Sequence, residues 1–514
     1  MAVKVPDEEV APVSYTVYKS GSLYVAKPSR RSGLKQICGL DGLSVLNAVV
    51  NALSAGGKVA IKGEILVNGT VSVTNAKITF EGASKSAKVV QTATNAPLFS
   101  VSADDVTFEG LSLVGKGDGN ALDACVRLAG SAKRLTVRGC DLSNCTFGVY
   151  VEGHQSIIEG NHIHDLQGDT SVGVRVLGDG NRILGNVIVG GVDAINVQDS
   201  QNYADYNIIA NNYCEGQSHS GIVVLYGKGN VVIGNNVKNC QDLGIDISWG
   251  ADDTVVKGNT VHSVGSYCVD LDANYIVCSG NLLINDKADV NGVGIWVQGG
   301  KYCLISTNII MGSGLKYGIV LSTPASAYNR VLFNYIGYCS SYAIYINNAS
   351  CQYNVFYGNV FEGVGEFYYI KPAAQWNWIL DNYDVALGGV MRVSRVIDIP
   401  VRVHDLVCPV GITNVQVVHI PAYSEVALIS FSGYASGGSV RVELWDGSTV
   451  CYSRELSATP IELETGDSVF RPLWQSVLTW NTQKPLTVRI YNYSTASRTV
   501  TFTLTLRVIC ASLA

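Results

Sequence analysis

The sequence is poor in charged residues and has no long apolar run. Charged side chains make up 15% of the 514 residues, against roughly 25% in an average soluble chain. The formal net charge is −6, so we do not expect a nucleic-acid partner, which would need a clustered basic face. Because no run of about 18 apolar residues occurs, we expect no membrane insertion. The N-terminal stretch lacks the apolar core of a signal peptide. A surface protein would then need another export route, such as release inside a virion.

What the sequence does contain is a repeat of about two dozen residues from Val137 to Asn382. One half is a small residue followed by apolar, variable and apolar positions, as in GVRV at Gly173 and GIWV at Gly294. The other half carries an asparagine, usually after glycine, with spacings of 22 to 27 residues. This asparagine column comprises Asn161, Asn186, Asn212, Asn235, Asn259, Asn281, Asn308, Asn334, Asn359 and Asn382.

Apolar alternation within a repeat of this length predicts short strands, each with one buried face. Because equivalent positions recur in every repeat, consecutive turns should stack as a solenoid, whereas propeller blades need about 40 residues or more. A side-chain amide at a bend can hydrogen-bond its equivalent one turn away, at about 4.8 Å. The sequence therefore predicts an all-β protein built on a right-handed parallel β-helix.

The 14 cysteines do not follow the spacing of a zinc site. Several fall on repeated positions: Cys140 lies where the asparagine column would begin, and Cys268 replaces a small strand-start residue. Interior cysteine behaves as a small apolar side chain. We therefore expect buried thiols in preference to disulfides, with Cys140 and Cys145 as the first pair to test.

The N-terminal segment differs from the repeat. Its first 12 residues are acidic and irregular, and the next stretch, SYTVYKSGSLYVAK, alternates Tyr and Val around a turn, which predicts a β-hairpin. A helix should begin after Asp41 as N-cap and end at Gly56 and Gly57. Since a solenoid leaves its terminal turn unpaired, this helix is expected to cap it.

The C-terminal segment also departs from the repeat. Short alternating strands separated by turns predict a β-sandwich of the jelly-roll type, with Phe470, Trp474 and Trp480 in its loops. Three regions are therefore expected: an N-terminal tail and hairpin over 1–40, the capping helix and β-helix over 41–385, and a C-terminal β-sandwich over 386–514.

The hairpin YTVYKSGSLYVAK, the expected helix, the stretch GGKVAIKGEILV and the asparagine-bearing repeats together resemble the pectate-lyase-like superfamily. Within it they resemble viral tailspike and surface-spike proteins, over roughly residues 14–385. The expected C-terminal domain resembles tailspike modules that trimerise or bind glycans. Because β-helices host lyases, hydrolases, isomerases and inert fibres, the resemblance fixes no single chemistry.

Candidate functional residues lie on the outer face of the repeated strands. The third residue of each GIxV unit faces outward, which gives the column Tyr150, Arg175, Asn196, Val223, Asp246, Asp270, Trp296, Val320 and Tyr345. Asp246, Asp270 and Asp272 should lie about 5 to 8 Å apart. Glycosidase carboxylates need about 5–5.5 Å for retention or about 6.5–9.5 Å for inversion. Like charges one turn apart also raise one pKa, as a general acid requires.

The same face offers residues for substrate binding. Trp249 and Trp296 could stack on sugar rings, with Arg175, Asn196 and Tyr345 completing the expected surface. These assignments, like the catalytic ones, depend on the outward direction of the third position.

A second candidate set, Asp193, His219 and Asp242, lies at the turns just before these strands. Asp193 resembles the catalytic aspartate of polygalacturonase-like hydrolases, which precedes a strand in a DCIAV-like context. His219 lies one residue early and lacks the flanking glycines, and the Asn-Thr-Asp and Arg-Ile-Lys signatures are absent. The resemblance implies catalysis at Asp193 and leaves pectin specificity in doubt.

Other interpretations stay open. Solenoid turns are rich in Asp, Asn and Gly for hydrogen bonding alone. We predict no metal or cofactor, although three carboxylates could hold Ca²⁺ as in pectate lyases. Arg175, the candidate lyase base, lies about three turns from the aspartates. His154, His162 and His164 are expected to alternate faces and to form no ligand set.

These observations favour a virion or cell-surface spike, assembled as a homotrimer, that recognises a host polysaccharide. Virion proteins could attach through its N-terminus, and the location would be extracellular or on the virion surface. Cleavage by the aspartate cluster stays open, and a glycoside hydrolase fits better than a Ca²⁺-dependent lyase. The alternatives are a secreted polysaccharide hydrolase or lyase and a purely structural or adhesive fibre.

Overall fold

The computed structural model describes residues 13–385 except 31–32, 118, 120–122, 199–203, 288–290, 325, 372–373, 375–376 and 381. From residue 392 onward it describes strands without their side chains. The chain forms two compact units, Met1–Asn354 with Gly363–Ala374, and Val355–Glu362 with Gln375–Ala514. Within the described residues, no helix is both long and apolar enough to cross a bilayer.

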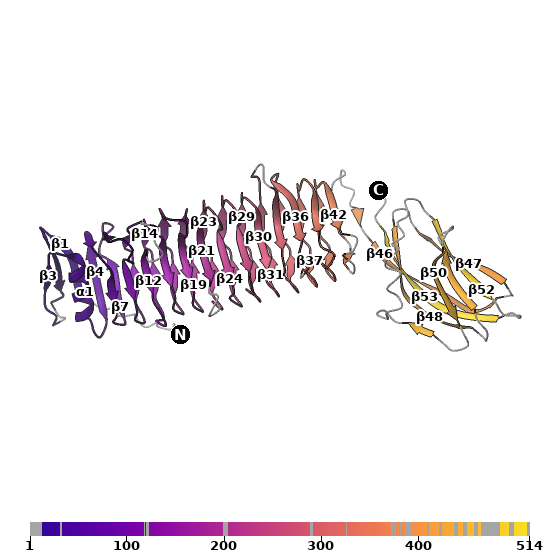
Figure 1. Ribbon diagram of the computed structural model, residues 1–514, viewed down its shortest axis with the longest axis horizontal. Coiled ribbons are helices and arrows are strands. Elements are labelled where there is room, and N and C mark those ends of the chain that lie inside the picture. The colour runs from indigo at the N-terminus through magenta and orange to yellow at the C-terminus, as the bar shows by residue number, and fades with distance from the viewer. Residues whose placement is uncertain are drawn as a thin grey trace, which may run out of the picture. The chain divides into compact units, whose positions relative to one another are not determined.

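The first unit is a parallel β-helix in which each turn adds one short strand to each of three sheets (Figure 1). The first sheet contains β4 (Gly57–Lys62), β7 (Ile78–Gly82), β10 (Thr107–Glu109), β13 (Thr136–Arg138), β16 (Ile157–Glu159), β19 (Arg182–Leu184), β22 (Ile208–Ala210), β25 (Val231–Ile233), β28 (Val255–Lys257), β31 (Val277–Ser279), β34 (Leu304–Ser306) and β37 (Arg330–Leu332).

The second sheet follows the first in each turn. It contains β5 (Glu64–Val67), β8 (Lys88–Gln91), β11 (Ser112–Val114), β14 (Asp141–Ser143), β17 (His162–His164), β20 (Val187–Val189), β23 (Tyr213–Glu215), β26 (Asn236–Lys238), β29 (Thr260–His262), β32 (Leu282–Ile284), β35 (Ile309–Met311) and β38 (Tyr335–Gly337).

The third sheet closes each turn and carries the GIxV units. Its 13 strands are β6 (Val71–Val73), β9 (Phe99–Val101), β12 (Ala124–Leu128), β15 (Phe147–Val151), β18 (Val172–Val176), β21 (Asp193–Gln198), β24 (Ile222–Leu225), β27 (Ile245–Ser248), β30 (Tyr267–Asp272), β33 (Gly292–Val297), β36 (Leu315–Leu321), β39 (Tyr342–Ile346) and β42 (Glu366–Ile370). The predicted parallel β-helix is confirmed.

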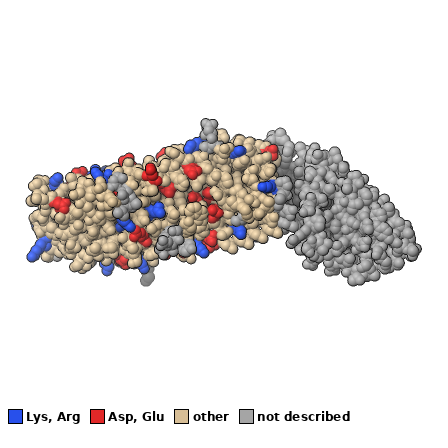
Figure 2. Space-filling model, in the orientation of Figure 1, with Lys and Arg blue, Asp and Glu red and all other residues tan. Residues whose placement is uncertain are grey.

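The core lies inside the turns, where the strands place one apolar side chain after another. The three consecutive strands β19, β20 and β21 belong to the three different sheets. They contribute Ile183, Ile188 and Ile195, and all three side chains are fully buried. Most of the outer face shown in Figure 2 is uncharged, and the few charged side chains are mixed in sign. The apolar alternation that predicted the strands is therefore the alternation between core and solvent.

The asparagine column forms a continuous ladder at the bend between the first and second sheets. Asn186 Nδ2 donates to Ile158 O at 2.9 Å and to Asn212 Oδ1 at 3.0 Å. Its Oδ1 accepts from the backbone N and the Nδ2 of Asn161. The buried amide thus uses both donors and both acceptor positions, and the same pattern recurs from turn to turn through Asn308.

A second asparagine column, which sequence analysis did not separate, joins the third sheet to the next turn. Asn207 Oδ1 accepts from Asn181 N at 2.7 Å, and Asn230 Oδ1 accepts from Asn207 N at 2.8 Å. All three side chains are fully buried. Backbone donors that no strand can reach are satisfied in this way at both bends.

The N-terminal segment forms a hairpin, a third strand and a helix, which ends at Ala52, before the predicted end at Gly56 and Gly57. The hairpin consists of β1 (Tyr15–Ser20) and β2 (Leu23–Pro28), followed by β3 (Ile37–Gly39), and β1 pairs in parallel with β4. The helix α1 (Gly42–Ala52) begins after Asp41, whose carboxylate accepts from the backbone N of Leu43 and Ser44. Its apolar face is buried and lies against β3, β5 and β6.

The described cysteines are free thiols, as expected. Ten are buried and Cys38 is exposed. Burial raises the pKa of the Cys140 thiol to about 11, which keeps it protonated and unreactive. Cys408, Cys451 and Cys510 lie among residues whose side chains are not described.

The second unit contains short strands and two antiparallel sheets. The short strands are β40 (Val355–Tyr357), β41 (Val360–Glu362), β43 (Trp378–Leu380), β44 (Tyr383–Asp384) and β45 (Arg392–Val393). Strands β40 and β43 pair in parallel, as do β41 and β44, whereas β44 and β45 pair antiparallel. One four-stranded sheet has the order β46 (Arg395–Cys408), β53 (Arg498–Cys510), β48 (Ser424–Ala435) and β51 (Ile461–Leu463). The other has the order β47 (Gly411–Ile420), β52 (Lys484–Asn492), β49 (Val440–Trp445) and β50 (Val450–Leu456). The loop residues Phe470, Trp474 and Trp480 and the 12 N-terminal residues lie outside the described residues.

Candidate acid–base site

The outward column predicted from the sequence runs along the third sheet. Cross-strand partners link its members in order: Arg175, Asn196, Val223, Asp246, Asp270, Trp296, Val320 and Tyr345. Asp246 and Asp270 are direct partners on β27 and β30, so their backbones lie about 4.8 Å apart. Asp272 is the partner of Ser248 on the same two strands. The structure therefore brings the three predicted aspartates together.

Asp270 is the most enclosed member of this cluster, with only 5% of its surface exposed. Gln298 Nε2 donates to its Oδ2 at 2.9 Å. Its Oδ1 is buried and has no hydrogen-bond partner among the described residues. The adjacent Asp246 is partly buried and accepts a hydrogen bond from Ser248 Oγ. One carboxyl oxygen of Asp270 is therefore available to carry a proton or to bind a ligand.

Burial and mutual repulsion separate the acidities of these carboxyls. Burial first, then the charges of Asp246 and Asp272, raise the pKa of Asp270 to about 8. Burial also raises the pKa of Asp246 to about 6, against the opposing effects of Ser248 and His219. The pKa of Asp272 is raised by burial as well. At neutral pH, Asp270 is thus mainly protonated and Asp246 mainly ionised, which is the pairing that acid–base chemistry requires.

His219 connects the second candidate set to this cluster. Its Nδ1 lies 3.0 Å from Asp193 Oδ1, and its Nε2 lies 3.7 Å from Asp242 Oδ2. The hydrogen bond to Asp193 raises the pKa of His219, and the charges of Asp242 and Asp246 raise it further. The two sets that the sequence analysis considered separately therefore form one cluster of interacting charged groups across β21, β24, β27 and β30.

An open groove of about 800 Å³ lies at the N-terminal side of this charged cluster. Arg175, Asp193, Asn196, Gln198 and His219 contribute to its lining. Asn196 Nδ2 donates to Asp193 Oδ2 at 2.8 Å, whereas the buried Asn196 Oδ1 has no hydrogen-bond partner among the described residues. The groove thus presents polar groups that can bind hydroxyls of a ligand next to the aspartates.

Aromatic side chains flank the cluster unevenly. The Trp296 ring lies 4.2 Å from that of Tyr267, centroid to centroid, and burial raises the pKa of Tyr267. Trp249 is 57% exposed at the end of β27 and contacts Tyr226. Tyr345 lies two strands beyond Trp296 and stacks on Tyr317, Tyr342 and Tyr369, away from the aspartates.

Sequence analysis missed Tyr267 and the role of Gln298. Tyr267 precedes Asp270 by three residues, as Asp193 precedes Asn196. Extending the outward alternation to the residue before each small strand-start position would have found it. Arg175 lies three strands from Asp246, as the sequence predicts, so it does not join the cluster.

The expectation that the histidines alternate faces is wrong for His162 and His164. His162 and His164 are two residues apart on β17 and share one face, where both contact Asp141 of β14. His154 lies apart, with its Nδ1 3.5 Å from Asp179 Oδ2. Asp141, His162 and His164 therefore form a group that could hold a metal ion, on a different sheet from the aspartates.

Comparisons with known proteins agree with the architecture. Residues 166–288 match a family model described as the right handed beta helix region. The chain is a right-handed parallel β-helix protein. Residues 274–384 of this β-helix protein also match the model of the periplasmic copper-binding protein NosD. A search of curated proteins finds no match.

Solved structures similar to this β-helix protein include the mannuronan C-5 epimerase AlgE6 A-module of Azotobacter vinelandii. It is 13% identical, with 67% of this chain and 95% of that one covered and a TM-score of 0.48. The Dettilon tailspike protein is 13% identical, with 86% and 90% covered and a TM-score of 0.48. The catalytic domain of GH87 alpha-1,3-glucanase in complex with nigerose is 16% identical, with 66% of both chains covered and a TM-score of 0.45.

Proposed function

We propose that the protein binds a polysaccharide along the third sheet and hydrolyses it at the Asp246–Asp270 pair. The main support is Asp270, a buried carboxyl with a pKa of about 8, directly opposite an aspartate with a pKa of about 6. One of the Asp270 oxygens has no hydrogen-bond partner among the residues that the structure describes. The neighbouring groove supplies polar groups, and Trp296 with Tyr267 supplies an aromatic surface. Sugar rings commonly meet both kinds of group in a binding site.

The chemistry follows from the two protonation states. Protonated Asp270 gives its proton to the glycosidic oxygen as the bond to the anomeric carbon breaks, while the Asp246 carboxylate attacks that carbon. A water molecule, deprotonated by Asp270, then hydrolyses the glycosyl ester and restores both groups. Direct cross-strand partners suit the separation of about 5–5.5 Å in retaining enzymes.

Asp270→Asn should reduce cleavage by at least about 10²-fold, because the amide preserves shape but cannot donate the proton. Reducing-end release would be measured on polysaccharides that the wild type binds on a glycan array, and binding should persist. The exposed Asp253→Asn is the matched control and should cleave normally. Full activity in Asp270→Asn would contradict the proposal. Unsaturated products that require Ca²⁺ would instead identify a lyase.

A second candidate function is attachment without cleavage, as a spike on an extracellular or virion surface. The two antiparallel sheets that follow the β-helix support it, since a packed sandwich there can mediate assembly or bind glycans. In this proposal, α1 caps the solenoid and virion proteins bind the N-terminal residues. No cleavage would be found for any bound glycan, and Trp296→Ala should abolish binding.

We further propose that the protein assembles as a homotrimer. Exposed aromatic rings along the β-helix, including Trp249 and Tyr369, support a contact between copies. Light scattering at micromolar concentration should give about three times the chain mass of 54.8 kDa. A stable monomer would count against assembly through either unit, without affecting the proposed hydrolysis.

A further inference from the structure

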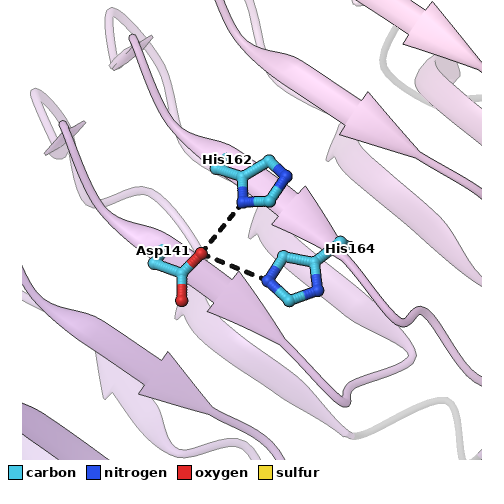
Figure 3. Close-up of side chains that lie close together, drawn as sticks. All are labelled: Asp141, His162 and His164. Atoms are coloured by element: carbon cyan, nitrogen blue, oxygen red, sulfur yellow. Dashed lines mark hydrogen bonds and ion pairs between the residues drawn. The ribbon is translucent and has the colours of Figure 1, made fainter.

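A cluster of three side chains on the second sheet has the composition of a transition-metal site. Asp141 lies on β14, and His162 and His164 lie on the adjacent β17 (Figure 3). The strand register pairs Asp141 with His162, and His164 follows two residues later on the same face. One ligand atom from each residue lies within 4.8 Å of the others.

The distances suit a shared cation. Asp141 Oδ1 lies 3.1 Å from His162 Nδ1 and 3.1 Å from His164 Nε2, so one carboxylate oxygen faces two imidazole nitrogens. Zn²⁺ binds such atoms at about 2.0–2.2 Å in tetrahedral geometry, which separates neighbouring ligands by about 3.4 Å. The two Asp141–histidine distances are therefore within a few tenths of an ångström of this spacing, and all three ligand atoms lie within 4.8 Å of one another.

A second carboxylate, that of Asp165, lies beside His164 and outside the three-residue cluster. The other ring nitrogen of His164, Nδ1, lies 2.8 Å from Asp165 Oδ2. A metal ion on Nε2 would leave Nδ1–H to donate to Asp165. This carboxylate–histidine–metal order is the one that orients metal-binding histidines in proteins.

The site is open on its outer side. The side chains of Asp141 and His162 are about half exposed, at 48% and 53%, and that of His164 is 27% exposed. A hollow of about 310 Å³ beside Asp141 is also lined by Lys88 and Ser112. Water can therefore fill the remaining coordination positions, as in metal sites with three protein ligands.

We propose that Asp141, His162 and His164 bind one divalent transition-metal ion of the Zn²⁺ class, with Asp165 as a positioning residue. Two imidazoles and one carboxylate favour Zn²⁺, Ni²⁺ or Cu²⁺ over Ca²⁺ and Mg²⁺, which select oxygen ligands. The site lies outside residues 274–384 and on a different sheet from the aspartates, so it rests on neither the copper-protein match nor the proposed hydrolysis.

Isothermal titration with Zn²⁺ tests this site on the full chain after removal of tags and chelator. Cys38, which is exposed, is replaced by serine in every variant to remove a competing ligand. We expect one ion per chain at micromolar affinity, and His162→Gln and Asp141→Asn should each weaken binding at least about tenfold. Asp165→Asn should weaken it about tenfold while keeping the stoichiometry, as loss of an outer carboxylate does.

His154→Gln is the matched control, because this histidine is also partly exposed and also lies near an aspartate, but among the described residues it belongs to no group of three possible ligands. It should bind Zn²⁺ as the wild type does. Electron paramagnetic resonance of bound Cu²⁺ provides a second readout. The wild-type spectrum should show coupling to two imidazole nitrogens, and the His162→Gln spectrum should show coupling to one. Binding only at millimolar Zn²⁺, or binding unchanged in His162→Gln and Asp141→Asn, would overturn the proposal.

Discussion

Asn235→Asp should lower the free energy of unfolding of the β-helix by about 3–5 kcal/mol at neutral pH, as removing one partner from a buried charged or polar pair does. Asn235 is 1% exposed, and its Nδ2 donates to Ile209 O and Asn259 Oδ1. A carboxylate there cannot donate, so it would face two oxygens at hydrogen-bonding distance. Its charge would also be buried without a counter-ion.

The neighbouring Asn236→Asp provides the control, because Asn236 lies on the same turn but is exposed. This variant makes the same chemical change in water, so we expect an effect below about 1 kcal/mol. Urea unfolding followed by far-UV circular dichroism would compare the two variants. The loss in Asn235→Asp should shrink at low pH, where the introduced carboxyl is protonated. Equal losses in both variants would show that the ladder contributes little to stability.

Asp270→Asn should stabilise the folded protein increasingly as pH rises. The folded-state pKa of about 8 lies above the usual 3.8, so proton binding favours the folded state. Its contribution is fully present below about pH 4 and is lost as pH rises through about 8. The amide mimics the protonated carboxyl at every pH. At pH 9 the free energy of unfolding of the variant should therefore be higher than that of the wild type by on the order of 2 kcal/mol or more.

Unfolding in urea at pH 5, 7 and 9 would measure this difference. Asp253→Asn, on the exposed surface nearby, should show no such trend. A constant difference between Asp270→Asn and the wild type across this range would mean that Asp270 is not held protonated. A variant that is more stable but no longer cleaves would be typical of an active site that retains an unfavourable charge for chemistry.

The sequence predicted the β-helix and the outward column because both depend on local alternation. Each GIxV unit fixes which side chain faces solvent, and stacking of turns makes Asp246 and Asp270 neighbours whatever the loops do. The asparagine ladder was predictable for the same reason, since one residue type recurs at one bend.

Contacts that depend on loop conformation were harder to predict. His219 precedes its strand, and nothing in the spacing indicates that its ring reaches Asp193 and Asp242 on both neighbouring turns. The histidine cluster was missed for another reason. His162 and His164 do share a face by simple alternation, but Asp141 belongs to the preceding turn, so only the strand register joins the three residues.

The ladder also determines how the length of this molecule can change. Within the ladder, each Asn side chain bonds to the equivalent Asn one turn before and one turn after, so removing one complete turn would let its two neighbours bond to each other. Removing half a turn would bring an asparagine opposite an apolar residue and leave buried donors unpaired. Adding or removing whole turns is therefore the change of length that destabilises such a protein least, and each turn changes the length along the axis by about 4.8 Å.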